Sequence, residues 1–148
     1  MLTPEIKKYV EKSVLCWLAT SSADNVPNVS PKEAFTYLED ELVVANIASP
    51  QTVQNIEENA KVCMSFIDVH IQKGFQVKGT ARIISEEDQD FSKYQNALEK
   101  LTEGKYPYPS VTIISADDIK RIIAPSYFLF PDITENEIME QSRKTYWK

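Results

Sequence analysis

The sequence predicts a mainly β (α+β) fold, in which about six antiparallel strands form a barrel or sheet that helices flank. Three observations support this prediction. Extended, apolar-rich stretches are separated by turn residues, and most follow one another along the chain with short connections. Three or four other segments repeat apolar residues at helical spacing. The chain has 148 residues, enough for one core, so we expect residues 1–148 to form a single domain.

The first element is expected to be a helix. Thr3 is a suitable N-cap, and Pro4 suits the first helical position because its missing N–H is not needed there. The helix should end near Ser13. Three apolar residues share one face, namely Ile6, Tyr9 and Val10.

The first half then continues as an antiparallel meander. Turn residues separate its strands, for example at residues 21–25 and 39–41. Pro27 and Pro31 interrupt the second stretch and indicate an edge or bulged strand, because proline cannot donate to a strand ladder. The expected strands cover residues 14–20, 26–37 and 42–47.

The second half mixes helices with strands. Ser49-Pro50 opens a helix, and acidic residues at 85–88 start another, which Gly104 should end. The buried stripe of that helix is expected to be Phe91, Tyr94, Leu98 and Leu101. Strands are expected at 62–67, 74–85, 111–114 and 122–130, followed by a helical tail at 134–148.

Charge and hydropathy exclude two kinds of partner. The net charge is −6, and no run of Lys and Arg exceeds two residues, so we expect no nucleic-acid binding. The apolar stretches are far shorter than the roughly 20 residues of a membrane-spanning helix, and the N-terminus lacks a secretory core. Cys16 and Cys63 each lie in an apolar run, typical of reduced core residues in a cytoplasmic protein; a disulfide between them is the alternative.

Several catalytic chemistries are not favoured. His70 is the only histidine, and with Cys63 and Asp68 it offers too few ligands for a zinc site, so we expect no metal. The three glycines cannot form a phosphate loop or a dinucleotide fingerprint. The carboxylate clusters lie at helix starts or on helix faces and are best explained as solvated surface.

Two segments are candidates for binding. In Asn46-Ile47-Ala48-Ser49-Pro50-Gln51-Thr52 a strand ends and a helix begins, so free backbone N–H groups and the Ser49 and Thr52 hydroxyls can hold a phosphate; a plain serine cap without ligand is the alternative. In Val29-Ser30-Pro31-Lys32-Glu33-Ala34-Phe35 proline leaves the backbone free to face a ligand. A proline- and lysine-protected edge strand explains the second segment equally well.

These two motifs, followed by the G-x-x-V-x-G-x-A strand at Gly74, resemble the pyridoxamine 5'-phosphate oxidase-like FMN-binding split barrels. The resemblance implies a six-stranded antiparallel split β-barrel that forms a homodimer and binds FMN at the interface. It implies that Ser49, Gln51 and Thr52 hold the phosphate. It also implies that Ser30, Pro31 and Lys32 run beside the flavin ring, and that Ala45, Asn46 and Ile47 touch the ring or the ribityl chain.

The sequence departs from that family at two places. Gln51 stands where many relatives carry a basic residue, and Lys32, Lys78 or Arg82 is expected to compensate. Lys32 is also a candidate for the N1/C2=O edge of the ring. The tail around Trp147 lacks the substrate-binding motif of the true oxidases, so we do not expect pyridoxamine oxidation.

The resemblance leads to three functional hypotheses. The first is an oxidoreductase that moves electrons or hydride from a nicotinamide-type donor to a small acceptor. The second is a non-catalytic flavin carrier or sensor. The third is an interaction domain without cofactor.

Overall fold

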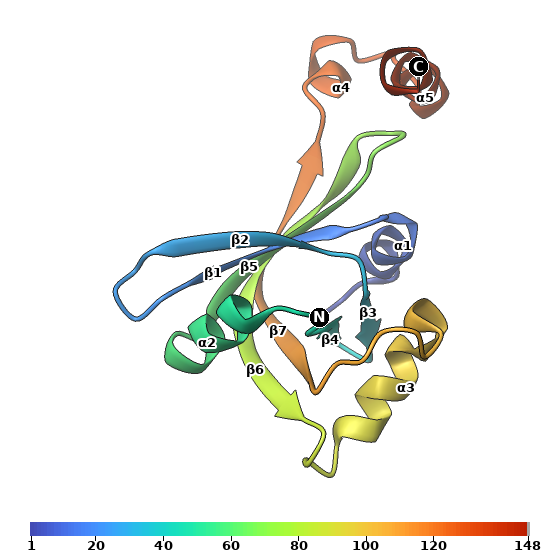
Figure 1. Cartoon of the computed structure of the whole chain (residues 1–148). Coiled ribbons are helices and arrows are strands. Elements are labelled where there is room, and N and C mark those ends of the chain that lie inside the picture. Colours follow the sequence, from blue (N-terminus) through green and yellow to red (C-terminus); the bar gives the residue numbers. More distant parts are fainter. Residues whose placement is uncertain (148) are drawn as a thin grey trace.

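The computed structural model describes residues 1–147 and consists of a curled antiparallel sheet with flanking helices (Figure 1). The strands are β1 (Cys16–Ser21), β2 (Pro27–Lys32), β3 (Phe35–Leu38), β4 (Glu41–Ala45), β5 (Lys61–Asp68), β6 (Lys73–Ser85) and β7 (Ser110–Ile123). The helices are α1 (Pro4–Lys12), α2 (Pro50–Glu58), α3 (Phe91–Thr102), α4 (Ser126–Leu129) and α5 (Glu135–Tyr146).

The sheet contains seven strands in the order β2-β1-β5-β6-β7-β4-β3 and curls into a half-barrel (Figure 1). The predicted mainly β fold class is confirmed. Seven strands are close to the predicted number of about six, but the boundaries differ. The extended stretch at 26–37 turns at Glu33 and Ala34, so that β2 pairs with β1 whereas β3 pairs with β4 at the opposite edge. This turn brings the end of β2 close to the end of β4.

Local sequence signals explain most helix ends. The Thr3 side chain accepts a hydrogen bond from the Ile6 N–H at 3.3 Å, as expected of the N-cap of α1. Helix α3, however, begins at Phe91 rather than at 85–88. The carboxylate of Asp88 accepts from the backbone N–H of Ser85 at 2.7 Å and holds this segment in turns.

The strand predicted at 111–114 is confirmed as part of a longer strand, but its separation from a second strand at 122–130, and the strand assignment beyond residue 123, are wrong. Strand β7 runs without interruption from Ser110 to Ile123, and its register against β6 shifts between Lys78 and Gly79, where Asp117 is the extra residue. Its second half carries polar residues because that half is largely exposed. The apolar residues after Pro125 form α4 instead of a strand.

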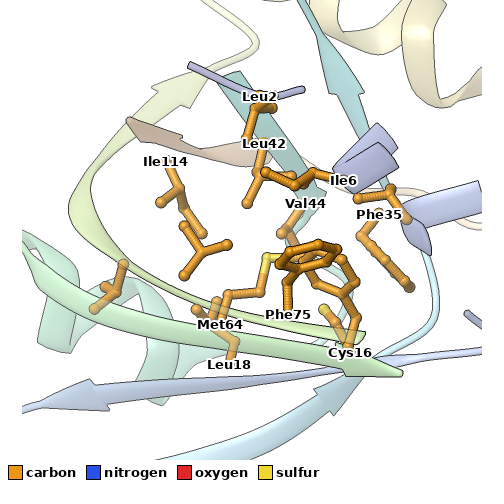
Figure 2. Packing of buried hydrophobic residues seen from close by; sticks show 14 of the residues in the cluster. Leu2, Ile6, Cys16, Leu18, Phe35, Leu42, Val44, Met64, Phe75 and Ile114 are labelled. Carbon is orange, nitrogen blue, oxygen red and sulfur yellow. The ribbon is translucent and has the colours of Figure 1, made fainter. Parts of the chain in front are cut away.

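The main core fills the inside of the curl. Figure 2 shows side chains from α1, β1, β4, β5, β6 and β7 meeting there, Cys16 among them. A second cluster lies on the other face of β4 and β7, under α3. Both cysteines are free thiols. Cys16 is fully buried as predicted, but the prediction for Cys63 is wrong: it is only half-buried because it alternates to the outer face of β5.

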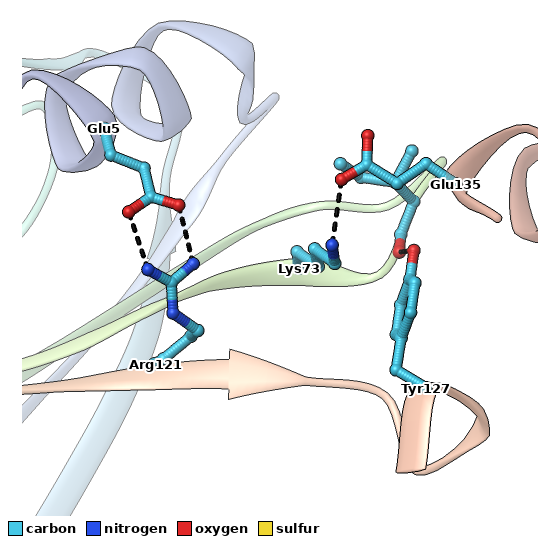
Figure 3. Close-up of polar contacts among 6 residues, drawn as sticks. Glu5, Lys73, Arg121, Tyr127 and Glu135 are labelled. Carbon is cyan, nitrogen blue, oxygen red and sulfur yellow. Dashed lines mark hydrogen bonds and ion pairs between the residues drawn. The ribbon is translucent and has the colours of Figure 1, made fainter. Parts of the chain in front are cut away.

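The last two helices lie beyond the C-terminal end of β7, next to the turn that joins β5 and β6 (Figure 1). Figure 3 shows how they are attached: Lys73 on β6 forms an ion pair with Glu135 at 2.8 Å, and the Tyr127 hydroxyl donates to the Ile71 carbonyl at 2.6 Å. The predicted helical tail is confirmed over Glu135–Tyr146, and Lys148 lies outside the described residues. Within residues 1–147, no helix combines the length and apolar character needed to cross a bilayer.

Candidate functional site

A buried ammonium group lies at the point where β2 ends. Lys32, the last residue of β2, has only 8% of its surface exposed. Its Nζ donates to the Ser49 Oγ at 2.6 Å and to the Thr52 Oγ1 at 3.2 Å. The Ser30 hydroxyl lies 3.4 Å from the same Thr52 oxygen. Two hydroxyl groups at the start of α2 therefore contact the cation, and a third hydroxyl, from β2, lies next to one of them.

The start of α2 has backbone donors that no side chain caps. Ala48, just before the N-cap, is held at φ 48°, a left-handed conformation that is rare for a residue with a Cβ. Ser49 is the N-cap by position, but its hydroxyl donates to the Ile47 carbonyl at 3.0 Å and makes no capping bond. Since Pro50 has no N–H, the first-turn N–H groups of Gln51 and Thr52 remain without helical acceptors. The positive end of the helix dipole thus adds to the charge of Lys32.

Within residues 1–147, the Lys32 ammonium has no carboxylate partner. Burial lowers the pKa of its ammonium group below the ordinary value, because neutral hydroxyls compensate a desolvated charge only in part. An anion placed against Lys32, Ser49 and Thr52 would offset the free-energy cost of burying this charge.

A pocket of about 440 Å³ opens beside this cluster. Its walls come from the ends of β2 and β4, the start of α2, and the end of α3 with the loop that follows. The lining residues are Val14, Pro31, Lys32, Glu33, Ala34, Ala45, Ile47, Ser49, Leu101, Thr102 and Tyr106. Apart from the Lys32 end and Glu33, the pocket offers mostly apolar surface to a ligand.

Most of the predicted binding residues gather here. Five of the nine line the pocket, namely Pro31, Lys32, Ala45, Ile47 and Ser49. Ser30 and Thr52 join them through the hydroxyl cluster. Of the three cations considered as substitutes for a basic residue at 51, Lys32 reaches the start of α2, whereas Arg82 pairs with Glu41 at 2.7 Å. The position of the Lys32 ammonium favours this compensating role over a place at the ring edge.

Two predicted residues point elsewhere. Asn46 is buried, and its side chain donates to the Ser110 Oγ at 3.0 Å and accepts from the Thr112 Oγ1 at 2.8 Å, so it ties β4 to β7. The exposed Gln51 side chain donates to the Asn55 Oδ1 at 2.8 Å. Asn55 in turn donates to the Thr20 Oγ1 at 3.0 Å and attaches α2 to the barrel.

The wall contributed by α3 was missed from the sequence. Leu101 was predicted to be buried, but the structure exposes 52% of it at the pocket and buries Thr102 in its place, so that prediction is wrong. The buried face of α3, formed by Phe91, Tyr94 and Leu98, continues with the residue four positions after Leu98, which is Thr102, and not with the residue three positions after it. Tyr106 also lines the pocket. The sequence signals that could have indicated this wall are the Leu101-Thr102 pair at the end of the helix and the Tyr-Pro-Tyr-Pro segment at 106–109.

The histidine packs against an aromatic side chain of the C-terminal region. The His70 ring stacks on Trp147 with ring centroids 5.5 Å apart, and its backbone N–H donates to the Asp68 carboxylate at 3.0 Å. In the part of the chain that the structure describes, no three His, Cys, Asp or Glu side chains are grouped as metal ligands.

The pocket therefore suits a ligand with an anionic group at one end and a largely apolar body. Glu33, which is exposed, is the one carboxylate among the lining residues. The described residues thus provide binding and positioning, while group-transfer or redox chemistry would have to come from the ligand itself.

Known proteins resemble this chain in sequence. The family model for pyridoxamine 5'-phosphate oxidase matches residues 2–123. The uncharacterized protein MJ0282 of Methanocaldococcus jannaschii is 34% identical over 88 residues, which cover 57% of this chain and 58% of MJ0282. The match thus spans little more than half of that relative.

Solved structures agree with the family match. HupZ from Group A Streptococcus is 30% identical with a TM-score of 0.67, covering 80% of this chain and 92% of that one. A suggested pyridoxamine 5'-phosphate oxidase of Lactobacillus delbrueckii is 26% identical with a TM-score of 0.64, covering 80% and 93%. Lower identities, which show the fold alone, relate the chain to an FMN-binding protein of Syntrophomonas wolfei (15%, TM-score 0.69) and the heme storage protein HutZ of Vibrio cholerae (17%, TM-score 0.62).

Proposed function

Because the chain belongs to the pyridoxamine 5'-phosphate oxidase family, we propose that it binds FMN in the pocket between β2, β4, α2 and α3. The observation that carries the proposal is the buried Lys32 ammonium, which among the described residues has hydroxyl partners but no carboxylate. A phosphate monoester supplies the missing negative charge and accepts hydrogen bonds from Lys32, Ser49, Thr52 and the first-turn N–H groups of α2.

The apolar part of the pocket is suited to the flavin ring of FMN. Its volume of about 440 Å³ lies in the range of small-molecule sites. Pro31 on one strand and Ala45 and Ile47 after the other offer apolar walls to a flat ring system. In this proposal Lys32 and α2 hold the phosphate, and the strand ends orient the ring.

We propose that the protein acts as an oxidoreductase, in which electrons or hydride pass between a nicotinamide-type donor and a small acceptor. Bound FMN supplies that chemistry. The residues of the chain position the cofactor, keep its phosphate neutralised and shield part of the ring from water. A flavin carrier or sensor would use the same pocket without turnover, and reduction by NADH or NADPH distinguishes the two.

We further propose that the working unit is a homodimer. Trp17 is 49% exposed on the outer face of β1 and lines a mostly apolar groove with Val14, Ile67, Val69 and Ile122. A second copy would cover this groove and remove its apolar surface from water. Sedimentation of the wild-type protein and of Trp17→Lys tests this; a monomer in both cases would contradict it.

The FMN proposal is tested by the visible spectrum of the purified protein and of two charge variants of α2. Thr52→Glu places a carboxylate against the phosphate and should abolish the flavin band near ~450 nm. Gln54→Glu adds the same charge to an exposed position on the same helix and should retain the band. Because Thr52 is buried, circular dichroism must show that its variant folds, and Thr52→Val provides a milder substitution without the charge.

Two outcomes would contradict the proposal. The first is a wild-type protein that stays colourless after incubation with FMN. The second is a Soret band on adding haem together with no flavin uptake, which would favour the chemistry that the name of HutZ states.

A further inference from the structure

We propose that Tyr106 and Leu101, on the loop after α3 and its last turn, form a closing wall that packs on the flavin ring and determines how tightly the ring is held and shielded. This inference rests on the proposed function and adds to it residues that the family motifs did not indicate. Both side chains line the same pocket as Lys32 and Ser49.

The first argument is that, at the end of α3, a polar side chain is buried and its apolar neighbour is exposed, which is the reverse of the usual pattern. Thr102 is 2% exposed, whereas its apolar neighbour Leu101 is 52% exposed. The Thr102 hydroxyl donates to the Leu98 carbonyl at 3.5 Å, whereas the exposed part of the leucine gains no burial energy unless another group covers it. Leu101 faces the pocket, and so a flat apolar ligand there would provide that cover.

The second argument is the shape of the loop at 103–109. Glu103 and Gly104 both adopt left-handed conformations, with φ of 51° and 67°, which reverse the chain directly after α3. Tyr108 then packs against Phe91 with ring centroids 6.2 Å apart, so the far end of the loop is anchored to the helix. Tyr106 lies between these two fixed points and is 56% exposed at the pocket.

The third argument is that the exposed apolar groups converge. Val14 precedes β1 and is 74% exposed, yet it lines this pocket together with Leu101 and Tyr106. Three large side chains from separate parts of the chain thus expose apolar surface around one opening. Such an apolar rim next to a cationic end matches a ligand that is anionic at one end and aromatic at the other.

The test measures FMN affinity and ring exposure in variants of the wall. Tyr106→Ala and Leu101→Ala should each raise the Kd for FMN about tenfold and increase the quenching of flavin fluorescence by iodide. Tyr106→Phe keeps the ring and should behave as wild type. Phe128→Ala removes a similarly exposed aromatic group on α4, outside the pocket, and is the matched control.

The outcomes separate this inference from the proposed function. If wild type binds FMN but Tyr106→Ala and Leu101→Ala match Phe128→Ala in both readouts, the wall assignment is wrong and the FMN site stands. If wild type binds no FMN, both fail. Since both side chains are more than half exposed, neither substitution should lower the stability of the unliganded protein, and a loss there would indicate a structural role instead.

Discussion

Replacing Lys32 by methionine should have opposite effects on the unliganded protein and on its complex. In the unliganded protein, the ammonium is buried and bonds only to hydroxyls. After replacement, Ser49 still donates to the Ile47 carbonyl and Thr52 still has the Ser30 hydroxyl nearby. Exchanging a buried charge for an apolar side chain of similar length is often stabilising, and we expect a gain of about 1 kcal/mol in the free energy of unfolding.

The complex should respond in the other direction. A hydrogen bond from a charged group contributes roughly 1.5–3 kcal/mol, so the loss of the Lys32–phosphate contact should weaken FMN binding about 10- to 100-fold. The pKa of Lys32 is lower in the folded than in the unfolded protein. The free-energy cost of burying the charged ammonium in the unliganded protein is therefore largest at low pH and decreases as the pH rises toward the ordinary lysine pKa. Lys32→Met should remove this pH dependence.

Urea unfolding measures the first effect, and titration of flavin fluorescence measures the second. Lys78→Met, an exposed lysine on β6, is the control and should change neither by much. A Lys32→Met protein that is less stable than wild type and binds FMN equally well would refute the reasoning, since Lys32 would then be a structural residue.

Three further predictions concern single positions. Gln51→Lys should tighten FMN binding and Gln51→Glu should weaken it, each about threefold to tenfold, which fluorescence titration measures. Gln51→Glu should also slightly stabilise the unliganded protein through the dipole of α2, which thermal unfolding measures. Burial raises the pKa of Cys16 to about 12, so stability should fall by about 1.4 kcal/mol per pH unit above pH ~9, and urea unfolding of Cys16→Ala should lack that part of the slope. Gly74→Ala should cost about 2–3 kcal/mol because its Cβ would overlap the Phe66 carbonyl oxygen; an unchanged urea midpoint would contradict the close strand approach.

The elements that could be predicted are those whose signals are local. Thr3-Pro4 and Ser49-Pro50 mark the starts of α1 and α2 through chemistry contained in a few residues. Strand β7 was divided because its middle carries polar residues, and only pairing with β6 along its whole length shows that they belong to one strand. Phe128 and its neighbours are apolar but have no strand to pair with, so hydrophobicity alone misassigned them.

The site was predicted in part for the same reason. The residue types around Ser49 suggested an anion site, but the contact between Lys32 and Thr52 depends on how the curled sheet brings the end of β2 to α2. The spacing of residues along the sequence does not predict the distance between the Lys32 and Thr52 side chains. Leu101 was missed because apolar residues of a helix were expected to face the core, whereas this one faces the pocket. Tyr106 was missed because it lies in the loop after α3, where no residue pattern predicts a contact with the pocket.

The central claim is that a phosphate group docks between Lys32 and the first turn of α2, and comparing two flavins tests it most directly. Calorimetric titration with FMN and with riboflavin, which lacks the phosphate, isolates that group. We expect FMN to bind at least about 100-fold more tightly than riboflavin, with the difference reduced in Lys32→Met. Equal affinities for the two flavins, or no binding of either, would contradict the account.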